Sequence, residues 1–272
     1  DLCFSIREDS VDETGLAAGA PHYLYLSDVN MYGGGQFHSG YDGSFTKNGP
    51  IINSYPVQGA HWERASEFDL GVDMRFFDQL NITVDWFKNK RDRILMRRAS
   101  FPSVLGYQNA IPWANVGKVD NTGLELSLNW TKTFQRDWTI DARFNYSYSR
   151  NKYVYVDEPD YPYIWQTRTG KPLSSTYGYV AEGLFRDEAE IKASPDQSLF
   201  GSTIMPGDIK YRDINGDGSI TSEDQIMLSP YGNMPRIQYG FGLSMQWKNL
   251  DLSVFFNGSA KRTIMISGVS PF

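Results

Sequence analysis

The chain has 272 residues, a net charge of −6 and a mean hydropathy of −0.45, and 15% of its residues are aromatic. No window approaches 18 consecutive apolar residues, which excludes an α-helical membrane protein. The acidic balance argues against a nucleic-acid partner. A β-barrel is compatible with this hydropathy, because polar residues that face a lumen lower the average.

Six segments alternate apolar and polar residues, which predicts β-strands with one apolar and one polar face. In the clearest of them, residues 138–149, Trp138, Phe144 and Tyr148 lie among the apolar positions. About ten tilted residues is the length of a transmembrane strand, whereas strands of soluble proteins need only five or six. In chain order the predicted strands are 64–77, 80–88, 119–132, 138–149, 236–248 and 250–259.

The connections between these strands alternate in length, which predicts that all the short turns lie at one end. The short turns fall near Asp78, Gln135 and Asn249. Outer-membrane barrels combine short periplasmic turns with long external loops, so the long segments are expected to face outward. These predicted long extracellular loops are 8–62, 89–118 and 150–235. The predicted fold is therefore all-β: a partial transmembrane antiparallel β-barrel with an up-and-down meander, over the whole of 1–272.

Four tryptophans are expected to form an interfacial aromatic girdle close to the short turns. They are Trp86, Trp130, Trp138 and Trp247. The alternative for each is an ordinary core position in a soluble β-sandwich.

One motif has the composition of a Ca²⁺-binding loop, in residues 213–224. Oxygen-bearing side chains occupy its positions 1, 3 and 5, glycine follows at position 6, and a carboxylate stands at position 12. A hard cation needs six to eight oxygens, which a tightly coiled loop can supply. Position 12 is Asp rather than Glu, as in dockerin-type loops, and the alternative is a solvated turn without an ion. The predicted ligands are Asp213, Asn215, Asp217, Ser219 and Asp224.

The third long segment also carries an aromatic cluster that could stack against a sugar or a peptide. Its members are Tyr161, Tyr163 and Trp165. The sequence contains no HExxH, GxSxG or Walker A pattern, so no catalytic residues are nominated and the protein is not expected to be an enzyme.

Four stretches resemble one family, the SusC/RagA-type TonB-dependent outer-membrane transporters. They occur in the family's order between residues 61 and 260. The stretches read HWERASEFDLGVD (61–73), NVGKVDNTGLE (115–125), GYVAEGLF (178–185) and PGDIKYRDINGDG (206–218).

This resemblance implies a 22-stranded barrel with an N-terminal plug in the outer membrane of a Gram-negative bacterium. It implies import of oligosaccharides or peptides, driven by TonB and assisted by a SusD-like surface lipoprotein. Six strands cannot close a barrel, because unpaired edges in lipid leave backbone groups unsatisfied. The chain is therefore expected to be a piece of a transporter, with the TonB contact in a part that lies outside it.

An alternative reading is a secreted, calcium-stabilised β-domain that binds carbohydrate. The two hypotheses differ in what meets the apolar strand faces. In a transporter these faces meet lipid, whereas in a soluble domain they form a dry core between two sheets.

Overall fold

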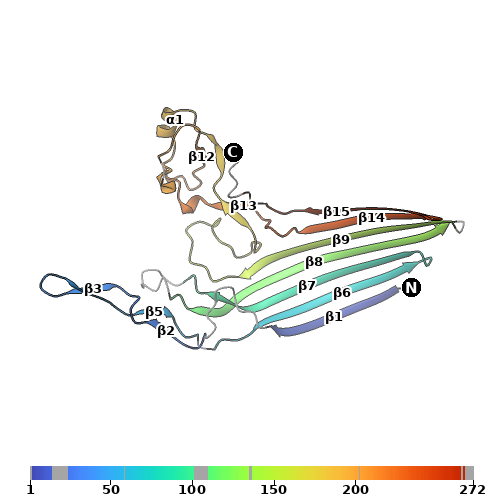
Figure 1. Cartoon of the computed structure of the whole chain (residues 1–272), viewed down its shortest axis with the longest axis horizontal. Coiled ribbons are helices and arrows are strands. Elements are labelled where there is room, and N and C mark those ends of the chain that lie inside the picture. Colours follow the sequence, from blue (N-terminus) through green and yellow to red (C-terminus); the bar gives the residue numbers. More distant parts are fainter. Residues whose placement is uncertain are drawn as a thin grey trace.

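The computed structural model describes residues 24–57, 59–100, 110–134, 137–201, 203–264 and 266, and the backbone path of 2–13. Its main feature is one antiparallel sheet of seven strands in the order β1-β6-β7-β8-β9-β14-β15, which runs along the molecule in Figure 1. The strands are β1 (Leu2–Glu13), β6 (Glu63–Phe76), β7 (Leu80–Arg97), β8 (Trp113–Phe134), β9 (Trp138–Tyr155), β14 (Ile237–Trp247) and β15 (Leu250–Ala260). The all-β meander and the six predicted strands are confirmed, and β1 is an additional strand.

Tight turns join the strands at one end of the sheet, as predicted. Phe77 and Asp78, between β6 and β7, both have positive φ angles (52° and 55°), and Lys248 between β14 and β15 has a φ of 53°. Such left-handed conformations let a strand reverse within two residues. The turns after β6 and β14 lie at the right-hand end of Figure 1, where β8 also ends and β9 begins.

The connections at the other end are long, but their strands are longer than the sequence predicts. β7 continues to Arg97 and β8 begins at Trp113, so the second connection is 98–112 rather than 89–118. β9 continues to Tyr155, and the third connection is 156–236 rather than 150–235. β1 reaches Glu13, so the first connection is 14–62 rather than 8–62. The sheet thus extends past the alternating segments into the region of the loops.

Short strands form within the long connections, at the end of the sheet opposite the tight turns, here called the loop end. In the first connection β2 (Asp28–Asn30) pairs with β5 (Ile51–Ser54), and β3 (Gln36–Ser39) pairs with β4 (Phe45–Asn48). This pair of ribbons reaches beyond the sheet in Figure 1. No helix of the described residues is long and apolar enough to cross a membrane.

The third connection folds into a small compact unit, here called the loop assembly (residues 156–236). Two ribbons and three short helices build it, and it sits above the loop end of the sheet (Figure 1). The elements are β10 (Thr176–Gly178), β11 (Ala181–Leu184), α1 (Glu188–Ala193), η2 (Ser198–Phe200), β12 (Ile209–Tyr211), η3 (Ser222–Asp224) and β13 (Ile226–Ser229). β10 pairs with β13, and β11 pairs with β12.

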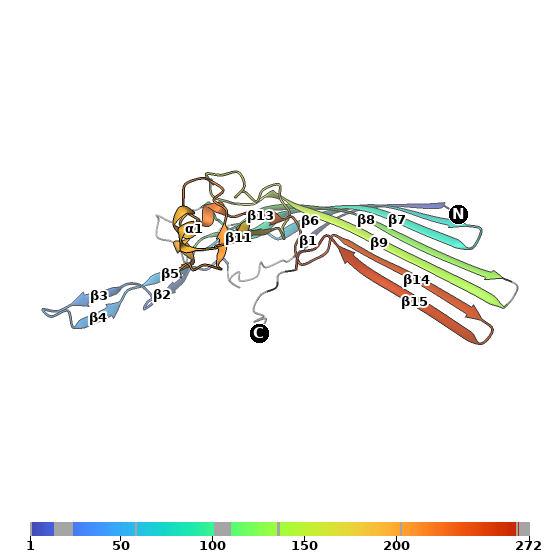
Figure 2. The same cartoon turned by 90° about the horizontal axis from the view of Figure 1, so that it is seen from above.

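The strand register aligns apolar residues with apolar residues across the sheet. Leu126 of β8 pairs with Val84 on one side and Tyr146 on the other, and Tyr146 pairs with Tyr239. The alternate positions pair Ser127 with Thr83 and Asn145. One face of the sheet is therefore apolar, and the other is polar, as the alternation predicts. Figure 2 shows that the sheet is twisted and open, with β1 and β15 far apart.

The predicted girdle of four tryptophans is only partly right. Trp138 and Trp247 pair at the short-turn end, and their rings stack with centroids 5.3 Å apart. Trp86 instead lies six residues beyond Leu80, about 20 Å along the strand from that turn. It pairs with Leu124, which pairs with Tyr148. Strands are staggered, so a residue's place in its own hairpin does not give its depth in the sheet.

Candidate functional site

The polar face of the sheet is lined by carboxylates and hydroxyls that hydrogen-bond across strands. Thr83 donates to Asp73 (2.7 Å), and Thr131 donates to Asp141 (2.6 Å). Ser127 donates to the Oδ1 of Asn145 (3.2 Å). These pairs fix the strand register, and they leave free lone pairs on the carboxylates that can meet water or a polar solute.

A shallow groove of about 420 Å³ crosses the strands at mid-sheet and includes this polar face. Glu125, Asn145 and Gln238 are among its polar lining residues, and Phe255 contributes a ring. In the sequence, the only sign of these residues is their place in the polar half of the alternation. Such a wall can present hydrogen-bonding groups to a hydrophilic passage.

Glycines on the polar face make room for two aromatic rings. A Cβ on Gly123 would collide with the Phe87 ring, and a Cβ on Gly242 would come within 3.1 Å of Phe255. The rings therefore lie flat across neighbouring strands instead of projecting from the wall. This packing keeps the polar face smooth.

The apolar face has no protein cover among the described residues, although it carries large side chains. Exposed fractions reach 44% for Phe241, 56% for Leu252 and 64% for Phe256. The alternative of a soluble sandwich required a second sheet packed on this face, and the described residues contain no such sheet. Apolar area on this scale marks an interface with another partner or with lipid.

The loop assembly, in contrast, has a conventional small core. Phe185 and Ile220 are 3% and 1% exposed. Gln197, also buried, donates to the carbonyl of Ile209 (3.0 Å) and accepts from the amide of Tyr211 (2.8 Å), so its amide side chain replaces a missing stretch of sheet. Three partly exposed rings pack against one another in the same assembly, with centroids 5.2–5.5 Å apart: Tyr179, Phe200 and Tyr211.

The predicted Ca²⁺ loop coils tightly around its own side chains. Asp213 accepts hydrogen bonds from the amides of Gly216 (2.6 Å) and Gly218 (2.8 Å), both of which have positive φ. Asn215 accepts from the amide of Asp217 (3.0 Å), and Asp217 accepts from the amide of Ser219 (2.8 Å). The oxygens at positions 1, 3 and 5 are thereby held on successive turns of one coil.

Asp224, the predicted ligand at position 12, is fully buried and bonded to backbone. Its carboxylate accepts from the amides of Ile214 (2.8 Å), Asn215 (3.3 Å) and Thr221 (2.8 Å). Burial acts to raise the pKa of Asp224, but these amide hydrogen bonds outweigh it and hold the pKa below its ordinary value. The carboxylate therefore closes the loop through the backbone. Among the described residues no three His, Cys, Asp or Glu side chains gather in a metal-binding arrangement.

The predicted aromatic platform is in part a structural contact. Tyr163 and Trp165 stack with centroids 4.5 Å apart and an interplanar angle of 8°. The indole of Trp165 donates to the carbonyl of Glu223 (2.9 Å), which ties this segment to the Asp213 loop. Tyr161 is 36% exposed and shares no ring contact with the other two. The structure thus joins two of the three residues and leaves Tyr161 apart.

An ion pair between the half-exposed Arg98 and the buried Asp157 joins the second connection to the loop assembly. Asp157 is 5% exposed and accepts from Arg98 (3.1 Å) and from the amide and hydroxyl of Ser100. Burial acts to raise the pKa of Asp157, but the bonds from Ser100 and the charge of Arg98 together lower it. The sequence gives no sign of this contact, because its partners are 59 residues apart.

Comparison with known proteins matches residues 20–264 to the family model described as "TonB dependent receptor-like, beta-barrel". The chain is 27% identical over 235 residues to TonB-dependent receptor P3 of Formosa agariphila, covering 80% of this chain and 22% of that protein. It is 25% identical over 208 residues to TonB-dependent receptor SusC of Bacteroides thetaiotaomicron, covering 73% and 19%. The chain spans about a fifth of the length of these curated relatives.

Solved structures share the fold. The RagAB peptide importer in its "open-open" state matches with a TM-score of 0.66 and 19% identity, covering 96% of this chain and 26% of that one. The "closed-closed" state matches with a TM-score of 0.64. The similarity covers both the seven-stranded sheet and the long connections.

Proposed function

The chain belongs to the TonB-dependent receptor β-barrel family, and we propose that it forms one side of the barrel of an outer-membrane importer. The observation that carries this proposal is the seven-stranded meander with one apolar and one polar face. Lipid covers the apolar face, and the polar face lines the lumen. The long connections then lie outside the cell.

The open edges of the sheet fit a larger barrel. Among the described residues β1 and β15 each have one neighbouring strand only. Unpaired backbone groups in hydrocarbon cost several kcal/mol each, so these edges need further strands of the whole transporter. These relatives are about four times as long as this chain, which leaves ample sequence for further strands.

The proposed cargo is an oligosaccharide or a peptide. Support comes from the named relatives, one of which is SusC and another the RagAB peptide importer. Import in this family draws on TonB, and the proposed external partner is a SusD-like lipoprotein that meets the long connections. The hydrogen-bonding groups of the polar face suit either kind of solute.

The barrel proposal is tested in the full-length parent protein. Cells are fractionated, membranes are extracted with detergent, and migration on a gel is compared before and after heating. Recovery in the outer membrane with a heat-dependent shift supports the proposal. Recovery as a soluble protein without detergent would overturn it and restore the secreted-domain alternative.

The aromatic residues of the loop assembly are proposed to contact the cargo. Tyr163 is the better test position, because Trp165 also holds the Asp213 loop. Tyr163→Ala removes a ring worth about 0.5–1.5 kcal/mol in a stacking contact. Ile164→Ala is the control, since Ile164 lies between the two rings and is 83% exposed. Equal affinity of both variants for defined oligosaccharides and peptides would remove this site from the proposal.

We also propose that the Asp213 loop takes up Ca²⁺. The carboxylates of Asp213 and Asp217 keep lone pairs beyond their bonds to backbone amides, and hard oxygen donors suit this cation. Titration of Ca²⁺ into the metal-free parent protein, followed by calorimetry, tests this. We expect one binding event that Asp213→Ala abolishes, and binding that survives this change would place the ion elsewhere.

A further inference from the structure

A band of aromatic side chains marks the loop end of the apolar face. Trp86 pairs with Leu124, which pairs with Tyr148, so these three lie in one row across β7, β8 and β9. Phe68 of β6 packs edge-on against Trp86, with ring centroids 5.9 Å apart. Aromatic rings of this kind occupy the boundary between hydrocarbon and headgroups. The outer membrane boundary on this wall therefore runs through Trp86 and Tyr148.

Four cationic side chains follow directly beyond this band, on the same face. Lys88 and Arg150 stand two residues past Trp86 and Tyr148, and each pairs with Thr122 between them. Lys90 and Lys152 stand two residues further, with Asp120 between them. From strand spacing and rise, the four Cα positions frame an area of about 10 by 7 Å.

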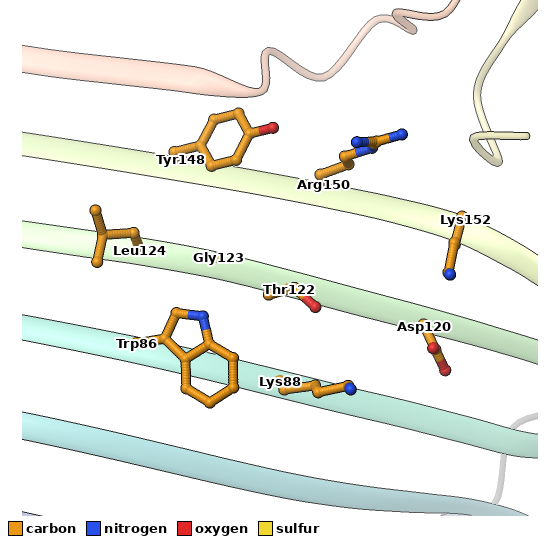
Figure 3. A pocket seen from close by; sticks show the side chains of 9 residues that line it. All are labelled: Trp86, Lys88, Asp120, Thr122, Gly123, Leu124, Tyr148, Arg150 and Lys152. Atoms are coloured by element: carbon orange, nitrogen blue, oxygen red, sulfur yellow. The ribbon is translucent and has the colours of Figure 1, made fainter.

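Three of these cations, Lys88, Arg150 and Lys152, line a groove rather than a flat surface. The groove has a volume of about 570 Å³, with Trp86, Leu124 and Tyr148 at its apolar end. Figure 3 shows Lys88 and Arg150 extending along their strands away from the two rings, with Lys152 directed toward the neighbouring strand β8. A further cation, Lys261, lies 5.8 Å from the centre of the Tyr148 ring.

The four cations have no carboxylate partner. Among the described residues, no ion pair involves Lys88, Lys90, Arg150 or Lys152. Among the lining residues, Lys88, Arg150 and Lys152 are positive and Asp120 is the one carboxylate, which leaves two positive charges in excess. Like charges placed this close repel one another, so an anion that binds among them is stabilised.

The opposite end of the same face is organised differently. There Lys132 lies 5.0 Å from the ring centre of Phe134, and Lys248 lies 5.7 Å from that of Trp247. Each of these two cations lies near an aromatic ring. Neither lines one of the grooves found in the described part of the chain. Among the described residues, the loop end of the wall thus presents a grouped set of unpaired cations above an aromatic band, and the short-turn end does not.

We propose that this groove binds the phosphate of an anionic lipid headgroup in the outer leaflet. The inference rests on the proposed function, because it needs the apolar face to lie in a membrane. Acyl chains would pack along Leu124 and Tyr148, and the phosphate would sit among Lys88, Arg150 and Lys152. Charge-assisted hydrogen bonds from Arg and Lys suit phosphate oxygens, and the snorkelling stems of these side chains reach the headgroup level.

The test uses the full-length transporter purified in a non-ionic detergent, with monophosphoryl lipid A as the probe. Binding is measured by native mass spectrometry against the same lipid after removal of its phosphate. We expect the phosphorylated form to bind at least about tenfold more tightly. Lys88→Gln combined with Arg150→Gln removes two of the cations and should abolish this preference. The control is Lys132→Gln combined with Lys248→Gln, which should keep it.

Each other outcome is decisive. Equal binding of the two lipids, or full preference in the Lys88→Gln and Arg150→Gln variant, would overturn the inference. Inorganic phosphate that displaces the lipid at millimolar concentration would assign the groove to a free anion. A protein that is retained by the wild type and lost from the variant, without any lipid preference, would assign it to a protein partner.

Failure of the barrel itself is recognised on the same samples. A wild-type protein without heat-modifiable migration would sink the proposed function, whereas a heat-modifiable wild type without phosphate preference would sink only this inference. Should the double variant fail to assemble, Lys152→Gln serves instead, because its exposed side chain lies beyond the aromatic band. A several-fold loss of preference is expected from this single change.

Discussion

The seven-stranded sheet, here called the wall, leaves its large apolar residues exposed, whereas the loop assembly buries its own. In the loop assembly, residues 156–236, Phe185 and Ile220 are buried by the assembly's own chain. In the wall, Phe241 and Phe256 are among many large apolar residues that remain exposed. The wall is held by its hydrogen-bond ladder, and its apolar face is left for the proposed contact with lipid. The loop assembly is expected to be stable in water, whereas the wall is expected to be stable only in lipid.

The largest expected effect of one substitution is in the core of the loop assembly. Phe185→Ala removes a ring that is 3% exposed and should cost about 3–5 kcal/mol of local stability. Limited proteolysis of the full-length protein should then cut within residues 156–236, while heat-modifiable migration of the barrel persists. Loss of both together would show that the two regions do not behave separately.

A charge at mid-wall should have the next largest effect. Leu128 pairs with Ile82 and Phe144 in the middle of the apolar face, so Leu128→Arg should cost about 2–4 kcal/mol of assembly. Ser127→Arg is the matched control, because the neighbouring residue faces the lumen. Outer-membrane yield measures both variants. Similar losses from the two changes would contradict the assignment of faces.

Within the loop assembly, the buried carboxylate of Asp224 should matter more than the exposed one of Asp217. Asp224→Asn puts an amide donor among three backbone amides and should cost about 1–3 kcal/mol. Asp217→Asn keeps an oxygen for the backbone amide of Ser219 and loses only the exposed bond from the side-chain amide of Asn215, so it should cost little. Thermal unfolding followed through loop proteolysis compares the two. A larger loss from Asp217→Asn would refute the structural role of Asp224.

The smallest effect concerns the contact between the second connection and the loop assembly. The pKa of Asp157 is lowered in the folded state, so its contribution is present above the unfolded value of about 4 and is lost as pH falls through the folded value. Arg98→Gln should weaken this contact by about 1 kcal/mol at pH 7, because Arg98 is 43% exposed. Hydrogen exchange around Ser100 should rise in the variant at pH 7 and in the wild type below pH 4. Exchange that is unchanged by Arg98→Gln would count against the contact.

The alternation of apolar and polar residues, with a period of two, accounts for most of the fold features that the sequence predicts correctly. The alternation in 138–149 reports the strand, its two faces and its short-turn end, because all three follow from one local geometry. The sequence did not predict β1, because its apolar alternation stops after Ile6 and most of the residues that follow are charged. β7 and β9 are longer than predicted for the same reason. Their backbones stay hydrogen-bonded to the neighbouring strands after the apolar alternation ends.

The features that the sequence does not predict depend on contacts between residues far apart in the chain. The depth of Trp86 depends on the stagger of strands, which local spacing does not record. The stacking of Tyr163 on Trp165 is local, but the bond from Trp165 to Glu223 joins segments 58 residues apart. The loop motif at Asp213 was visible because its ligand spacing is local.

The claim that the apolar face meets lipid is tested most directly by accessibility along β8. Single spin labels at successive positions 123–131 are introduced into the full-length protein with Cys3 replaced by Ser, reconstituted in its membrane. The account predicts that oxygen accessibility peaks at Leu124, Leu126, Leu128 and Trp130, with a water-soluble nickel chelate reaching the alternate positions. Uniform accessibility, or peaks at Glu125 and Ser127, would contradict it.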